Sequence, residues 1–231
     1  MEPLILYFVL FFPGIYASGF SGETASAGTI PFSAIRELGR TLTYTLPSLA
    51  LLWYIVMGRD SRDKMPEKTK FFPVLKKLQK RDLFPFAAGL PGLIIIGLAV
   101  SQLVSFFLIY ENIFPESFSP PLLVEAPGSA WGWTVMAFSC IGTGYLEESY
   151  FRYYLLTRLE NRLPNPAIRI VISTILFSFC HMYEGPWGIL NAVLAGILLS
   201  MLFIRYGSIH GIAWAHGAYN IFVYAMGMFN R

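Results

Sequence analysis

The chain has 231 residues, of which 55% are hydrophobic and only 13% are charged, and its net charge is +3. Because a typical soluble domain carries about 25% charged residues, this composition excludes an ordinary soluble protein. It also argues against nucleic-acid binding, since the basic residues gather in one segment between apolar stretches and little polar protein accompanies them. We therefore expect an integral membrane protein in contact with the lipid bilayer.

Apolar stretches recur along the whole chain. The windows without a charged residue are 3–22, 41–58, 83–110, 126–146, 185–204, 206–230, which contains two histidines, and the shorter 170–183, which contains one. Several reach the about 20 residues that a membrane helix needs. Long apolar runs without alternation indicate helices rather than barrel strands. We predict an all-α, polytopic membrane helical bundle with seven to eight transmembrane helices, forming a single domain over residues 1–231.

The loops differ in charge, and this difference predicts an orientation. Segment 59–82 holds nine Lys or Arg residues against four Asp or Glu residues, whereas segment 111–130 holds three glutamates and no basic residue. Cytoplasmic loops of membrane proteins carry an excess of Lys and Arg. We therefore predict that loop 59–82 is cytoplasmic and that 111–130 lies on the other side. Further inner loops are expected at Arg158, Arg162, Arg169 and Arg205.

Three charged residues lie within a predicted span. Glu147 and Glu148 follow a charge-free run, and Arg152 comes four residues after Glu148. A charge near the bilayer centre costs at least about 2.5–3.5 kcal/mol on insertion scales. Residues four apart share a helix face, so Glu148 and Arg152 are predicted to form an ion pair. Glu147 is then the less well paired carboxylate, which suits it to proton transfer. A purely structural ion cluster is the alternative reading.

Two further groupings that contain polar residues occur on other predicted spans. Phe177 and His181 are four residues apart, as are His216 and Asn220. Counted from the inner ends of their spans at about 1.5 Å per residue, Glu147, His181 and His216 lie roughly 15, 18 and 14 Å deep, near the midplane of a core about 30 Å thick. We therefore predict that these side chains converge in one polar cavity.

The three motifs occur in a familiar order. "EESYFR", "FSFCH" and "HGAYN" together resemble the CAAX protease and bacteriocin-processing (CPBP, or Abi) family, which includes the type II CAAX prenyl endopeptidases, or Ras-converting enzymes. The resemblance covers about residues 130–225, and "YGSIHGIAWAHGAYN" is similar to the approach to the last motif. His210 has no counterpart in the motif, and we expect it to be an interfacial or packing residue.

The resemblance implies a glutamate-dependent intramembrane endopeptidase, a hydrolase of peptide or protein substrates. Glu147 would be the general base that activates water, with His181 helping to hold that water. His216 and Asn220 would stabilise the oxyanion. Glu148 would pair with Arg152 in a structural role, although a catalytic share for Glu148 stays open. Removal of the C-terminal tripeptide of prenylated CAAX proteins is the candidate reaction.

Other functions fit the same residues. Glu147, His181 and His216 form a His₂Glu set of the kind that catalytic zinc accepts, but the chain has no HExxH motif. We expect neither a metal nor another cofactor, with zinc as the alternative. Members of the resembled family are also linked to bacteriocin self-immunity and membrane scaffolding without essential proteolysis. A transporter with a proton-relay carboxylate is a third alternative.

Overall fold

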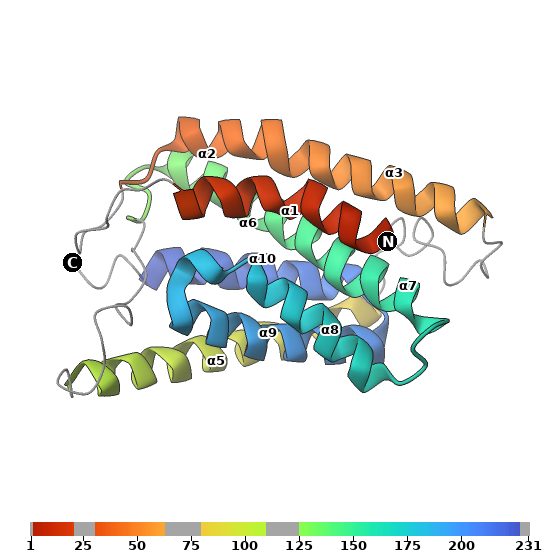
Figure 1. Ribbon diagram of the computed structural model, residues 1–231. Coiled ribbons are helices and arrows are strands. Elements are labelled where there is room, and N and C mark those ends of the chain that lie inside the picture. The colour runs from red at the N-terminus through yellow and green to blue at the C-terminus, as the bar shows by residue number, and fades with distance from the viewer. Residues whose placement is uncertain (1, 21–30, 63–79, 110–124, 227–231) are drawn as a thin grey trace.

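The computed structural model describes residues 2–20, 31–62, 80–109 and 125–226, and within these ranges every regular element is helical. Figure 1 shows the helices side by side in a bundle. The predicted all-α fold is therefore confirmed. Most of the predicted cytoplasmic loop, residues 63–79, lies outside the described residues, as do residues 110–124 of the predicted outer segment.

Seven helical stretches make up the described part of the chain, in rough agreement with the predicted seven to eight spans. In chain order they are α1 (Glu2–Phe20); α2 (Ala34–Arg40), π-helical η1 (Thr41–Thr45) and α3 (Leu46–Arg62); η3 (Lys80–Asp82) and α5 (Leu83–Ile109); α6 (Ala130–Glu148), π-helical η5 (Ser149–Leu155) and α7 (Leu156–Glu160); α8 (Pro166–Phe179); η6 (Met182–Glu184) and α9 (Gly185–Tyr206); and α10 (Ile209–Met226).

Three of these stretches are long and apolar enough to cross a membrane: Ala34–Arg59, Leu83–Phe107 and Met182–Tyr206. Two shorter apolar helices, Glu2–Pro13 and Pro166–Phe179, accompany them. Large apolar side chains such as Phe8, Ile95 and Val171 are exposed on the outside of the bundle. An apolar exterior of this kind is typical of helices that face lipid.

Helix α8 is short, and its length determines where His181 lies. The Asn165 side chain accepts a hydrogen bond from the Ala167 backbone nitrogen at 2.9 Å, and Pro166 occupies the first turn. The helix then runs for 14 residues, or about 21 Å. His181 consequently lies in the turn between α8 and η6. The prediction that His181 lies inside a membrane-spanning helix is therefore wrong.

An aromatic layer joins α1 to the π-helical segment η5. Tyr150 and Phe151 are fully buried and pack against Phe11 of α1, with ring centroids 5.2 and 4.9 Å apart. The Tyr150 hydroxyl donates a hydrogen bond to the Pro3 carbonyl at 2.6 Å. Helix α1 therefore covers η5, which directly follows the two glutamates of the EESYFR motif and carries Arg152.

Candidate active site

The candidate site lies where α6 packs against α10, and two glycines allow their close approach. A Cβ atom on Gly144 would lie 2.7 Å from the Ala213 carbonyl oxygen and 3.1 Å from the Gly217 nitrogen. A Cβ atom on Gly217 would lie 2.9 Å from the Cα atom of Ile141. The two backbones are thus in direct contact. This contact brings the end of α6, which carries the glutamates, against the residue that precedes Gly217, His216.

Glu148 is fully buried between two cationic or hydrogen-bonding groups. Its Oε1 atom lies 2.7 Å from Nδ1 of His216, and its Oε2 atom lies 3.1 Å from Nε of Arg152. The predicted ion pair between Glu148 and Arg152 is therefore present, with both side chains fully buried. Buried charges need such partners, because an unpaired buried charge is strongly destabilising.

Arg152 also lies against aromatic rings. Its guanidinium carbon is 4.3 Å from the ring centroid of Phe177 and 5.8 Å from that of Phe151. A cation over an aromatic face within about 6 Å is attracted by the ring quadrupole, and the attraction increases when both groups are desolvated. Phe177 therefore contributes to holding the charge of Arg152 inside the bundle.

Glu147 has a different environment from its neighbour. Its side chain is 14% exposed, and its Oε2 atom lies 3.6 Å from Nε2 of His216. That separation exceeds hydrogen-bond distance, and no group among the described residues donates a hydrogen bond to this oxygen. The two adjacent carboxylates thus differ in exposure: Glu148 is fully buried and contacts His216 through Oε1, whereas the Glu147 side chain is partly exposed although its Oε2 atom is buried.

His181 joins the site through Phe177. Its Nδ1 atom lies 3.0 Å from the Phe177 carbonyl oxygen, and the two rings are 4.6 Å apart. The same phenylalanine packs edge-on against His216 at 6.0 Å. On the other side, the His181 ring stacks with Tyr183 at 6.5 Å and an interplanar angle of 19°. Phe177 therefore lies between the two predicted imidazoles and the arginine.

The structure brings four of the predicted residues into direct contact: Glu147, Glu148, Arg152 and His216. Asn220 follows His216 by one turn on α10 and is half-buried. His210 is buried and its Nδ1 lies 2.7 Å from the Tyr145 hydroxyl, as expected for a packing residue.

Two aromatic contacts of the site were not predicted. The contact of Phe177 with Arg152 was missed, although its place four residues before His181 was the available signal. Tyr183, which stacks on His181, has no such signal, because it lies two residues away in a turn whose path the sequence does not specify.

The three residues of the alternative zinc reading, Glu147, His181 and His216, are not gathered as a ligand group among the described residues. Among the described residues, no three His, Cys, Asp or Glu side chains form a group that could hold a metal ion. Both ring nitrogens of His216 face carboxylates, and Nδ1 of His181 is directed at a backbone carbonyl. No chemical step through zinc is therefore derived from this geometry.

A comparison with known protein families gives a match for the part of the chain that carries the candidate site. The model of the family described as type II CAAX prenyl endopeptidase Rce1-like matches residues 129–222. No curated protein and no solved structure matches the chain. The matched range contains all three motifs and all six predicted site residues. Residues 129–222 therefore match the Rce1-like type II CAAX prenyl endopeptidase family, in agreement with the family that the motifs resemble.

Proposed function

We propose that this protein is a multi-pass intramembrane endopeptidase in which Glu147 activates the water that cleaves the peptide bond. The observation that carries this proposal is the contrast between the adjacent glutamates. Glu148 is fully buried and lies 2.7 Å from His216, whereas the Glu147 side chain is 14% exposed and lies 3.6 Å from the same ring. A general base must reach a water molecule, and of the two side chains only that of Glu147 has exposed surface.

The proposed reaction is a direct hydrolysis. Glu147 takes a proton from water, and the resulting hydroxide attacks the carbonyl carbon of the scissile peptide bond. The tetrahedral intermediate then collapses, the carbon–nitrogen bond breaks, and Glu147 returns the proton to the departing amine. The products are a new carboxylate and a new amine, and no covalent enzyme intermediate is formed.

His216 and Asn220 are proposed to stabilise the oxyanion. The contact between Nδ1 and Glu148 fixes the orientation of the His216 ring, so that Nε2 is the atom on the Glu147 side. The nitrogen that a histidine offers to a reaction is set by the bond that its other nitrogen makes. Asn220, one turn further along α10, would supply a second, neutral donor. Preorganised donors of this kind are effective in a site that excludes water.

His181 is proposed to hold the attacking water. The Phe177 carbonyl oxygen can only accept a hydrogen bond, so Nδ1 of His181, 3.0 Å away, carries the proton in that bond. In the neutral ring the lone pair is then on Nε2, which can accept a hydrogen bond from water. Stacking on Tyr183 limits the orientations that this ring can adopt.

The proposed substrate is a peptide or protein with a prenylated C-terminal CAAX sequence, following the description of the matched family. The test is to incubate the purified protein with a farnesylated CAAX peptide and to detect the released tripeptide by mass spectrometry. The same peptide without the farnesyl group, and the Glu147→Gln variant, are the controls. Release by the wild type from the prenylated peptide alone is expected. Equal release by the variant would exclude Glu147 as the base.

A further inference from the structure

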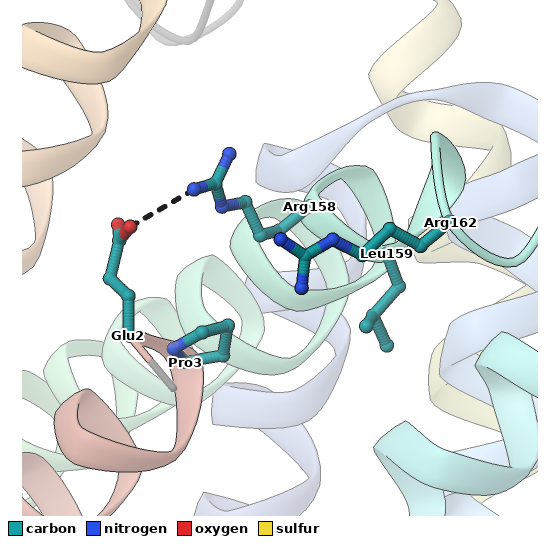
Figure 2. A pocket seen from close by; sticks show the side chains of 5 residues that line it. All are labelled: Glu2, Pro3, Arg158, Leu159 and Arg162. Carbon is teal, nitrogen blue, oxygen red and sulfur yellow. Dashed lines mark hydrogen bonds and ion pairs between the residues drawn. The ribbon is translucent and has the colours of Figure 1, made fainter.

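A second polar region lies away from the candidate active site. A cavity of about 250 Å³ is lined by Glu2, Pro3, Arg158, Leu159 and Arg162 (Figure 2). It lies between the start of α1 and the end of α7, at one end of the bundle (Figure 1). Arg158 follows Glu147 by eleven residues along one continuous helix, or about 16 Å, so the proposed chemistry does not use this cavity.

The cavity has an excess of positive charge. Arg158 forms an ion pair with Glu2 at 3.0 Å, and the Tyr154 hydroxyl donates to the other carboxylate oxygen of Glu2, also at 3.0 Å. Figure 2 shows the guanidinium of Arg162 directed toward the same space, beside Pro3 and Arg158. No carboxylate among the described residues forms a salt bridge with Arg162. Two arginines against one glutamate favour an anionic ligand, and guanidinium groups match phosphate oxygens well.

An apolar surface leads away from this cavity along α1. Five side chains on the next three turns after Pro3 are between 48% and 60% exposed: Leu4, Ile5, Phe8, Val9 and Phe12. A free phosphate would contact the arginines only. A phospholipid would contact both features, since its headgroup carries the phosphate and its acyl chains lie along apolar helix surfaces.

We propose that this cavity binds the phosphate group of an anionic phospholipid, with an acyl chain along the exposed face of α1. The cavity is at a helix end, which is the level of lipid headgroups when the bundle spans a bilayer. Basic side chains near the membrane surface attract anionic lipids. The proposal does not depend on the protease reaction.

The test compares lipid retention by native mass spectrometry. Purified protein in detergent is mixed with phosphatidylglycerol, phosphatidylcholine or inorganic phosphate, and bound molecules are counted. We expect selective retention of phosphatidylglycerol, and about fivefold weaker retention by Arg162→Gln, which follows from about 1 kcal/mol per basic residue. Arg205→Gln is the matched control, because Arg205 is an exposed arginine at the same end of the bundle outside the cavity.

Three results would overturn the proposal. Equal retention of phosphatidylglycerol and phosphatidylcholine would show that negative charge is not recognised. Equal weakening by Arg162→Gln and Arg205→Gln would show a general surface field rather than a site. Retention of inorganic phosphate equal to that of phosphatidylglycerol would assign the cavity to free phosphate. Because Arg162 is exposed, its variant is expected to fold, and an unchanged melting temperature without lipid would verify this.

Discussion

His216 places its Nδ1 atom 2.7 Å from Oε1 of Glu148, so the carboxylate that ends α6 holds the imidazole of α10. The same ring presents Nε2 to Glu147, but at 3.6 Å. One histidine therefore contacts two adjacent carboxylates with different atoms and at different distances. A variant of either glutamate removes one negative charge from the same site, yet only the Glu148 variant breaks a close contact.

Glu147→Gln and Glu148→Gln are therefore expected to differ in effect. Glu147→Gln should lower the rate of peptide cleavage by about 10²–10⁴, the usual contribution of a general base, without changing the melting temperature. Glu148→Gln should lower the melting temperature, because Arg152 then lies buried without its counter-charge. Cleavage assays and thermal unfolding in the same detergent measure both effects. Near-normal cleavage by Glu147→Gln would contradict the assignment.

Arg152→Ala is expected to destabilise the fold strongly. The change leaves Glu148 buried without its ion-pair partner and removes the cation over Phe177. Breaking a buried pair in this way costs about 3–5 kcal/mol. Arg158→Ala is the control, because its ion pair with Glu2 is about one-third exposed and such pairs contribute about 0–1 kcal/mol. The measurement is reversible unfolding in mixed micelles. Equal losses of unfolding free energy in the two variants would show that the buried pair contributes no more stability than the exposed pair.

The parts of the site that were predictable from the sequence are local. The ion pair of Glu148 and Arg152 follows from their spacing of four residues along one helix, and this spacing survives although Arg152 lies in a π-helical segment. The apolar windows likewise predicted helices, because each needs only its own composition.

The parts that were not predictable depend on packing between helices. The ring nitrogen of His216 that faces Glu148 is decided by the approach of α10 to α6, and the sequence gives no measure of that distance. The contact of Arg152 with Phe177 depends on how α8 packs against η5. Gly144 and Gly217 carry no chemistry of their own, so nothing marked them in advance.

Gly144→Ala is expected to separate α6 from α10. The added methyl group would lie 2.7 Å from the Ala213 carbonyl oxygen, so the two backbones must move apart. Overpacking of this kind lowers the free energy of unfolding by about 1–3 kcal/mol. The movement should lengthen the contact of Glu148 with His216 and lower the cleavage rate. Gly58→Ala is the matched control, since no atom lies within 4 Å of its added methyl group. Unchanged stability and cleavage in Gly144→Ala would contradict the close approach.

The two ends of the bundle differ in charge, and this difference predicts its orientation. Among the described residues, basic side chains outnumber acidic ones at one end of the bundle: Arg59, Lys80, Arg158, Arg162, Arg169 and Arg205 against Glu2, Asp82 and Glu160. At the other end acidic side chains outnumber basic ones: Glu37, Glu125 and Glu184 against Arg36 and Arg40. By the positive-inside rule we predict that the first end faces the cytoplasm. We expect Lys80→Cys to be labelled only in permeabilised cells and Gly128→Cys in intact cells, in a background without Cys140 and Cys180. Labelling of both positions from one side would exclude a spanning bundle in this orientation.

Asn220→Ala is expected to test the metal-free reaction, in which Asn220 donates a hydrogen bond to the oxyanion. Asn220 follows His216 on α10 by one turn, and the loss of an oxyanion donor typically lowers the rate by about 10²–10³. The variant should therefore cleave slowly while retaining the fold of the wild type.

A zinc enzyme would behave differently, since its metal content would depend on its ligands. His181→Ala and His216→Ala would then lose bound zinc together with activity. The deciding measurement is elemental analysis of the purified active protein, because a chelator can disturb a membrane protein directly. We expect far less than one zinc per chain in the wild type and no change in the histidine variants. One zinc per chain, lost in both variants along with cleavage, would exclude the metal-free reaction.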